Sequence, residues 1–313
     1  LARDSSGIRN ACGMEINMRK YLAEFLGTFI LTFTACGAAS FTGGYPGYLG
    51  VVGIALIFGL VVTAMCYSIG NVSGCHINPA VSLAMLISGR MNIIDFMGYV
   101  VAQMLGGVAA GFAMLGISVS LSSDTIDQYK TYGYDLVGLG TNGYGSQSAF
   151  LKINTWGAFL VELILTFIFV ITILGVTAKK EYKNIAGVVI GMSLAAVHLF
   201  GITLTGTGVN PARSFGPALA KAVAGDITPL SQVWLFIVAP LAGGVLAALV
   251  YMLLIYDKKS KSKSTTENSQ TEEVEIKTTD KTQAEESGEQ IDIKEASQDS
   301  KAPVETVELK EID

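Results

Sequence analysis

The chain has 313 residues, of which half are hydrophobic, 35 are glycine and only 15% are charged. Soluble globular domains contain roughly 25% charged residues, so this composition argues against a soluble enzyme and indicates a membrane protein. The formal net charge of −5 comes from the end of the chain, because residues 257–313 hold 9 Lys/Arg and 16 Asp/Glu, whereas residues 1–256 hold 12 and 10. The acidic balance therefore says nothing about a substrate, and no basic region points to nucleic acid.

Cysteine and histidine are too few and too scattered for a metal or redox centre. The four cysteines, Cys12, Cys36, Cys66 and Cys75, have no metal-ligand or redox spacing, and there are only two histidines. We therefore predict free thiols, no metal and no cofactor. No nucleophile–base arrangement is evident either, so we do not expect an enzyme.

Residues 1–17 are a polar extension that we expect to be disordered. The first 13 residues lack the apolar core of a signal peptide and precede Met14, so we expect them to lie upstream of the native start. Beyond this extension, six apolar stretches are long enough to cross a bilayer: 20–41, 48–69, 94–118, 154–178, 184–203 and 231–256.

Two copies of Asn-Pro-Ala lie between these stretches, at Asn78-Pro79-Ala80 and Asn210-Pro211-Ala212. Asn is a preferred N-cap and Pro is favoured at the first helical position, so each triplet predicts the start of a helix. The helices are expected to run to Ser88 and to about Lys221. Ten residues span roughly 15 Å, about half of a ~30 Å hydrocarbon core. We therefore predict two re-entrant half-helices.

The two halves of the chain repeat. Glu24 lies near the start of the first span and Glu162 near the start of the fourth, each followed after three residues by Thr-Phe. Three spans is an odd number, so the second repeat must be inverted in the membrane, which brings the two half-helix tips together near the midplane. Gly107-xxx-Gly111 and Gly243-Gly244 are interpreted as sites of close helix packing. The predicted fold class is an all-α membrane protein with six transmembrane helices and two re-entrant half-helices in an inverted repeat.

Basic residues orient the spans. Most of the basic residues fall on the same side of the membrane if the chain crosses it six times. By the positive-inside rule this side is the cytoplasm, so both termini are expected to be cytoplasmic. The basic residues on this side are Arg19, Lys20, Arg90, Lys179, Lys180, Lys183, Lys258, Lys259, Lys261 and Lys263. We predict a channel domain over 18–256, made of repeat one (18–118), an external, turn-rich loop (119–153) and repeat two (154–256). Residues 257–313 are expected to form an acidic, disordered cytoplasmic tail.

These residues resemble the aquaporins of the major intrinsic protein family, close to the bacterial water-channel branch. The resemblance covers roughly 18–256. It depends on the two Asn-Pro-Ala boxes with Ser73-Gly-x-His before the first and Arg213-Ser after the second, on both Glu-x-x-x-Thr-Phe openings, and on Asn142-Gly143-Tyr144-Gly145 in the long loop. It implies a passive, multi-pass water channel of the cell membrane, assembled as a homotetramer with one pore per subunit.

The predicted pore depends on helix ends and exposed backbone. Each half-helix N-terminus contributes about +0.5 charge, and the amides of Asn78 and Asn210 can donate to a passing water. Irregular backbone at membrane depth must line a wet cavity or be buried. The carbonyls of the segment before each tip are therefore expected to form a ladder of acceptors; they belong to Gly74, Cys75, His76, Gly206, Thr207 and Gly208. Glu24 and Glu162 are expected to accept hydrogen bonds from the re-entrant loops and fix them.

The resemblance also implies a selectivity filter of Phe58, His198, Thr207 and Arg213. Phe58 and His198 are bulky and leave little aperture, while Arg213 repels cations and donates to water. Glycerol facilitators of the family carry Asp after that Arg and Gly in place of His, whereas this chain has Ser214 and His198. One departure is Ile237 after Phe236, where water channels usually have Trp, and it puts strict water selectivity in question.

Three alternatives stay open beside the water channel. The first is an aquaglyceroporin-like facilitator of glycerol and small neutral solutes. The second is a proton-coupled secondary transporter, which would use Glu24 or Glu162 as its coupling site. The third is a non-conducting junctional protein, in which Arg213 would have no purpose. In addition, Cys75 adjoins the predicted pore lining, so we expect mercurials to block the channel from the cytoplasmic side through this thiol.

Overall fold

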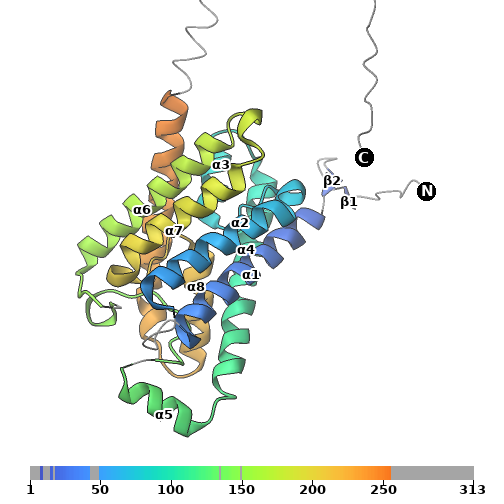
Figure 1. Ribbon diagram of the computed structural model, residues 1–313. Coiled ribbons are helices and arrows are strands. Elements are labelled where there is room, and N and C mark those ends of the chain that lie inside the picture. Colours follow the sequence, from blue (N-terminus) through green and yellow to red (C-terminus); the bar gives the residue numbers. More distant parts are fainter. Residues whose placement is uncertain are drawn as a thin grey trace, which may run out of the picture. The chain divides into compact units, whose positions relative to one another are not determined.

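A computed structural model describes residues 8–9, 15–16, 18–42, 49–133, 135–148 and 150–254. Six long apolar helices dominate it (Figure 1), each at least 20 residues long and so able to cross a ~30 Å core. They are α1 (Met18–Phe41), α2 (Gly50–Ser73), α4 (Ile93–Ser118), α6 (Thr155–Val176), α7 (Ala186–Thr205) and the C-terminal helix Thr228–Leu254. The predicted all-α fold class is confirmed.

Two short helices complete the predicted set. These are α3 (Pro79–Ile87) and α8 (Pro211–Val223), which begin directly after Asn78 and Asn210 with proline at the first helical position. The structure also has helix α5 (Ser123–Thr131) in the long loop, where we expected only turns. Ser122 caps it, its hydroxyl accepting from the Thr125 N–H, a signal that could have been found in the sequence.

The predicted ends of α2 and α7 were wrong by four and two residues, for the same reason. Helix α2 continues to Ser73 and α7 to Thr205, beyond the apolar stretches that defined the predicted spans. Each ends at a glycine in the left-handed conformation, Gly74 (φ 86°) and Gly206 (φ 75°), whose N–H bonds to a carbonyl of the last turn. Glycine is the preferred residue for such a C-terminal cap, so it marks the true ends of both helices.

Close glycine contacts relate the two halves. Gly107 on α4 faces the carbonyl oxygen of Ala212 in α8, and Gly244 on the C-terminal helix faces that of Ala80 in α3. Each half-helix therefore packs against the last long helix of the opposite repeat. A Cβ atom at either glycine would collide with backbone, which fits the predicted role of these glycines in packing.

Helices α2 and α7 meet in the same reciprocal way. Gly59 faces the carbonyl oxygen of Gly191, and Gly191 faces that of Gly59. This mutual contact is what an approximate two-fold axis between equivalent helices requires. Helix α1 packs against α2 and α4, and α6 packs against α7.

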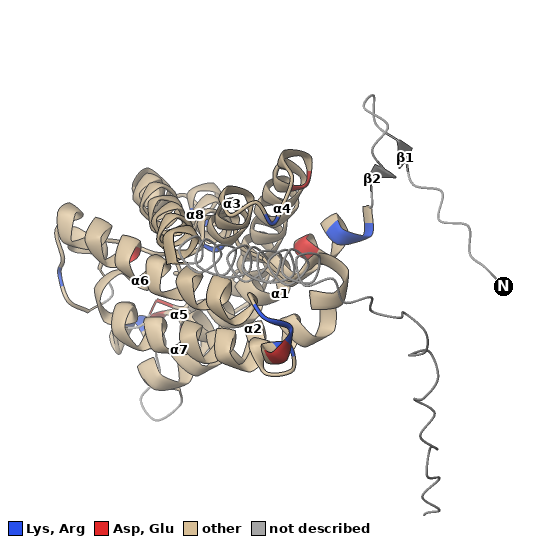
Figure 2. Cartoon of the chain, turned by 90° about the horizontal axis from the view of Figure 1, so that it is seen from above, with Lys and Arg blue, Asp and Glu red and all other residues tan. Residues whose placement is uncertain are grey.

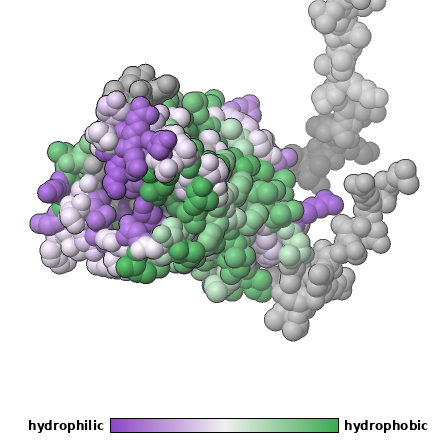
Figure 3. Space-filling view, turned by 90° about the horizontal axis from the view of Figure 1, so that it is seen from below, coloured by the Kyte–Doolittle hydropathy of each residue, from purple (hydrophilic) through white to green (hydrophobic). Residues whose placement is uncertain are grey.

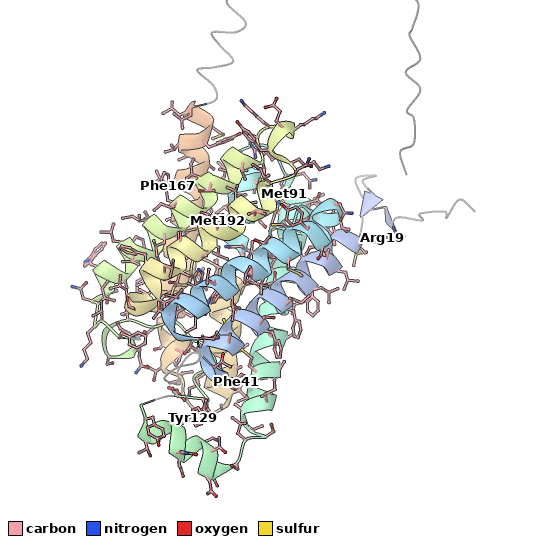
Figure 4. The ribbon with its side chains drawn as sticks, viewed as in Figure 1. Arg19, Phe41, Met91, Tyr129, Phe167 and Met192 are labelled. Carbon is pink, nitrogen blue, oxygen red and sulfur yellow. The ribbon has the colours of Figure 1, made fainter. Side chains whose placement is uncertain are left out.

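Charged residues are sparse along the helices (Figure 2), and hydrophobic residues cover much of the surface beside a hydrophilic region (Figure 3). Large apolar side chains such as Leu60, Leu105 and Leu253 are exposed on the long helices, as expected for surfaces that contact lipid. In Figure 4, Arg19 and Met91 lie toward one end of the bundle, and Phe41 and Tyr129 toward the other.

Much of both predicted terminal segments lies outside the described residues. Within residues 1–17, Ile8–Arg9 (β1) pairs antiparallel with Glu15–Ile16 (β2), a short pairing that the polar composition did not predict. The chain divides into two units at residues 256 and 257. The predicted acidic tail, residues 257–313, lies wholly outside the described residues, so its disorder stays a prediction.

Candidate functional site

The two Asn-Pro-Ala tips meet and are joined by reciprocal hydrogen bonds. Asn78 Nδ2 donates to the Val209 carbonyl (2.8 Å), and Asn210 Nδ2 donates to the Ile77 carbonyl (2.9 Å). The side-chain oxygens cap the helices, Asn78 Oδ1 accepting from Ala80 N–H (2.9 Å) and Asn210 Oδ1 from Ala212 N–H (3.1 Å). An amide nitrogen carries two hydrogens, so each Asn keeps one N–H for another acceptor.

Glu24, fully buried on α1, binds the loop before the first tip. Its carboxylate accepts from the backbone N–H groups of His76 (2.9 Å) and Ile77 (2.6 Å). It also accepts from the Ser73 hydroxyl (2.6 Å) and from Gln103 Nε2 (2.8 Å) on α4. Four donors compensate the cost of burying a carboxylate, and they fix the loop at the same time.

Glu162, fully buried on α6, binds the second loop in the same pattern. It accepts from the N–H groups of Gly208 (2.8 Å) and Val209 (2.7 Å) and from the Thr205 hydroxyl (2.7 Å). The equivalent contacts in both repeats are those that the sequence predicted for the two glutamates.

Both loops have unusual backbone. Cys75 (φ 54°) and Ile77 (φ 43°) lie in the left-handed region, and so do Thr207 (φ 47°) and Val209 (φ 47°) at the equivalent positions. Non-glycine residues rarely adopt this conformation, and it persists where surrounding contacts hold it. The hydrogen bonds to Glu24 and Glu162 provide such contacts in both loops.

A cavity lies beside both tips. The cavity volume is about 50 Å³. A single water needs about 10–15 Å³, so the cavity has room for a few waters. Most of its wall is apolar, including Val62, Phe169 and Leu194. The polar and loop residues in the wall are Gly74, Cys75, His76, Ile77, Asn78, Thr177, Gly208, Val209, Asn210, His198 and Arg213.

Two aromatic rings and a guanidinium come together in the wall of this cavity. The Phe58 and His198 rings stack with centroids 3.8 Å apart, and the Arg213 guanidinium lies 5.3 Å from the Phe58 centroid. All three side chains line the cavity and are almost fully buried. Three residues of the filter implied by the resemblance are therefore brought together.

Two complementary polar atoms at this end have no partner among the described residues. His198 Nδ1 lies 2.9 Å from the Leu194 carbonyl oxygen, which can only accept, so Nδ1 carries the hydrogen. In the neutral ring, Nε2 is then an acceptor, and it is buried and unpaired, as is the donor Arg213 Nε. Buried polar groups almost always have partners, so each of these two nitrogen atoms has hydrogen-bonding capacity that the described residues leave unused.

Thr207 and Gly206 are placed differently from the rest of the predicted set. Neither lines the cavity, and the Thr207 hydroxyl lies against Gly201 on α7 without a hydrogen-bond partner. The Gly206 carbonyl instead accepts from Arg213 Nη2 (3.4 Å). This part of the expected acceptor ladder is thus used to hold the arginine.

The sequence reasoning missed Asn142 as a site residue. Its Oδ1 accepts from Arg213 Nη1 (2.9 Å), beside the Gly140 carbonyl (2.8 Å), and its Nδ2 donates to the Thr205 carbonyl (3.3 Å). The long loop therefore anchors Arg213. The Asn-Gly pair was noted only as part of a motif, because a contact across 71 residues leaves no local signal in the sequence.

Replacing Asn142 with alanine should loosen Arg213. Hydrogen bonds to charged groups contribute about 1.5–3 kcal/mol, so we expect the arginine to sample other positions and glycerol exclusion to weaken by about tenfold. Relative water and glycerol permeability of proteoliposomes measures this. Unchanged exclusion in Asn142→Ala, with Ser146→Ala as an exposed control in the same loop, would contradict the anchoring role.

Comparisons with known proteins show to which family the chain belongs. The family model described as major intrinsic protein matches residues 13–251. The chain belongs to the major intrinsic protein family. Proteins named aquaporin Z are similar to this family member over 76% of its length: 43% identical in Rhodopseudomonas palustris (94% of that protein), 41% in Brucella melitensis (98%) and 39% in Bradyrhizobium diazoefficiens (94%).

The fold of this family member also matches a solved structure. An aquaglyceroporin from Plasmodium falciparum aligns with a TM-score of 0.61 over 75% of this chain and 95% of that one, at 23% identity. Identity this low bears on the fold alone. The similarity to aquaporin Z proteins confirms the predicted assignment to the bacterial type of aquaporin, a multi-pass membrane protein.

Proposed function

We propose that this chain is a passive water channel driven by osmotic gradients. The observation on which this depends most is the cavity whose wall contains Asn78 and Asn210 of the two Asn-Pro-Ala tips together with Phe58, His198 and Arg213. Its apolar wall binds water weakly, so molecules can leave, while the few polar groups replace some of the hydrogen bonds that water loses on entry.

The same groups favour water over ions and protons. The N-termini of α3 and α8 each place about +0.5 charge at the tips, and the Arg213 guanidinium adds a full positive charge at the narrow end. A cation entering this path meets positive potential and loses hydration. A water that accepts from the free N–H groups of Asn78 and Asn210 cannot also accept from its neighbour in the file. This interrupts the chain of hydrogen bonds along which protons would move.

A glycerol facilitator is the second candidate function. The stacked rings of Phe58 and His198 narrow the path, which favours water over a three-carbon solute. Ile237, the departure noted in the sequence, does not line the cavity and so supports neither function directly. The narrow end therefore favours the water channel.

A proton-coupled transporter has less support. No Asp or Glu is among the residues that line the cavity, and the carboxylates of Glu24 and Glu162 are occupied by three or four hydrogen bonds each. A coupling carboxylate must meet its substrate or ion during the cycle. Their contacts support a role in fixing the loops instead.

Stopped-flow light scattering on proteoliposomes tests the proposal. We expect osmotic water flux well above that of empty liposomes, little glycerol flux, and no response to a protonophore. Equal glycerol and water permeability would favour the facilitator, and flux that a protonophore abolishes would favour the transporter.

We further propose the cell membrane as the location, with both termini in the cytoplasm. Arg19, Lys20 and Arg90 support this orientation by the positive-inside rule, as do the lysines of 179–183. By its resemblance to the family, we propose a homotetramer with one pore per subunit, and the exposed apolar helix faces are available for its contacts. Light scattering of the detergent-solubilised protein measures the number of subunits.

Mercurial block through Cys75 follows from the proposed path. Cys75 lines the cavity at the loop before the first tip, so a mercury adduct there should obstruct the file. We expect p-chloromercuribenzenesulfonate to reduce water flux in the wild type and to leave Cys75→Ser unaffected. Cys36→Ser is the control, because this buried thiol does not line the cavity; undiminished block of Cys75→Ser would reject the mechanism.

A further inference from the structure

A chain of hydrogen bonds leads from the buried Glu24 to a side chain in the cavity wall. Gln103 Nε2 donates to Glu24 Oε2 (2.8 Å) and to Ser82 Oγ (2.9 Å). Ser82 Oγ in turn lies 3.1 Å from His76 Nδ1. The first three residues are fully buried, whereas His76 is partly exposed and lines the cavity. The chain therefore connects α1 and α4 to a ring that a water in the cavity can reach.

The hydrogen atoms of this chain can be counted. The Glu24 carboxylate only accepts, so the Gln103 atom that faces it is the amide nitrogen, whose two hydrogens go to Glu24 and Ser82. The Ser82 hydroxyl accepts from Gln103 and has one hydrogen to donate, for which His76 Nδ1 is the remaining partner among the described residues. A hydrogen on Nδ1 would leave this buried hydroxyl hydrogen without an acceptor, which is costly. The neutral His76 ring therefore has its hydrogen on Nε2.

The second repeat has no such chain. Ser214 is the equivalent of Ser82, since each lies four residues after the Asn of its tip, but the Ser214 hydroxyl is buried without a partner among the described residues. Gly208 is the equivalent of His76. Glu162 nevertheless holds the second loop through three hydrogen bonds. Fixing a re-entrant loop therefore does not require the chain, whose distinct effect is on the ring of His76.

The His76 ring lies where two spaces share a wall. It packs edge-on against Tyr99 of α4, with ring centroids 5.1 Å apart. Gly74 and His76 line the cavity and also an open pocket of about 530 Å³ that includes Arg90 and Asp95. A water that moves from the open pocket into the cavity loses hydrogen bonds to other waters. A fixed N–H donor at this place can replace one of them.

We propose that Gln103 and Ser82 are positioning residues, which fix His76 as a hydrogen-bond donor to water in the cavity. His198, in the same wall, has its hydrogen on Nδ1 and offers Nε2 as an acceptor. The two histidines thus present opposite polarity, because a water accepts from His76 Nε2–H and donates to His198 Nε2. The effect on water flux rests on the proposed function as a water channel, whereas the position of the hydrogen does not.

Solid-state NMR of the full-length protein in proteoliposomes tests the position of the hydrogen. The chain has only two histidines, so isotope-labelled histidine gives two ring systems if no histidine tag is used. Carbon–nitrogen correlations separate Nδ1, bonded to Cγ, from Nε2, bonded to Cδ2, and the nitrogen shift shows which carries hydrogen. At about pH 8, where an ordinary histidine is neutral, we expect one ring of each form, and His198→Gly should remove the form with hydrogen on Nδ1. A hydrogen on Nδ1 of His76 in the wild type would overturn the inference.

Variants test whether Gln103 and Ser82 set this state. Ser82→Ala and Gln103→Leu should each give a mixture of both forms at His76. They should also lower osmotic water flux by about fivefold, the effect of losing one ordinary hydrogen bond at a barrier. Ser82→Thr keeps a hydroxyl and should keep the wild-type ring signal and flux. Ser214→Ala removes the unpaired hydroxyl at the same position of the second repeat, so it should leave the His76 signal unchanged.

The outcomes separate this inference from the proposed function. Unchanged His76 signals in both Ser82→Ala and Gln103→Leu, or altered signals without loss of flux in a conducting protein, would overturn it. Gln103→Leu also removes a donor from Glu24, so if it fails to fold, Ser82→Ala and the wild-type spectrum decide. A wild-type protein with the expected ring signals that conducts no water would reject the proposed function and would still confirm the position of the hydrogen.

Discussion

Glu162→Leu is expected to prevent formation of a stable channel. Leucine cannot accept the hydrogen bonds of the Gly208 and Val209 N–H groups, which would be left buried and unpaired. Each such group costs about 1–3 kcal/mol, and the Thr205 hydroxyl loses its acceptor as well, so the total is several kcal/mol. That is a large share of the ~5–15 kcal/mol by which proteins are typically stable. Yield of monodisperse protein and its thermal unfolding in detergent measure the effect.

Two variants make this result specific. Glu162→Gln keeps one acceptor oxygen and the shape of the side chain, so its loss of stability should be smaller than that of leucine. Glu181→Gln changes an exposed carboxylate in the short helix η2 (Lys180–Tyr182) and should have no effect. An unfolding temperature of Glu162→Leu within error of the wild type would show that the carboxylate does not hold the second loop.

The double variant His198→Gly, Arg213→Val should convert the narrow end into a wide, uncharged one. The stacked ring beside Phe58 is removed, and so is the guanidinium. We expect glycerol permeability to rise by at least about tenfold, since removing groups worth about 1.4 kcal/mol at a barrier gives this factor. Cation leak should also increase, because the positive charge that opposes cations is lost. Stopped-flow scattering with glycerol and a fluorescent ion indicator measure the two effects.

The single variants separate size from charge. His198→Gly alone should raise glycerol flux more than cation leak, and Arg213→Val alone should raise cation leak. Lys221 lies on the same helix as Arg213, but it donates to the Val137 carbonyl and does not line the cavity. The permeability of the Lys221→Met variant should therefore equal that of the wild type. An unchanged solute and ion profile in the double variant would mean that these residues do not control entry.

The tips and their supports were predictable because they depend on local chemistry repeated in both halves. Asn followed by Pro specifies a capped helix start, and a lone carboxylate in an apolar span requires donors nearby. Both signals occur twice, at positions related by inversion. The structure has the corresponding caps at Asn78 and Asn210 and the corresponding donors around Glu24 and Glu162.

The features that were missed depend on contacts between distant segments. Asn142 binds Arg213 across 71 residues, and nothing local marks it as a partner. Thr207 was placed in the filter by resemblance, but in the structure its hydroxyl faces Gly201 instead of the cavity. Such placements are fixed by tertiary packing, which a sequence pattern does not specify.

The most direct measurement records water and proton movement together in the same proteoliposomes, by light scattering and an internal pH dye, under an imposed osmotic gradient and membrane potential. If two half-helix ends meet at a file of water, water flux should exceed that of empty liposomes by at least about tenfold while the proton leak stays the same. A proton leak that rises with water flux, or water movement that needs a proton gradient, would contradict this account.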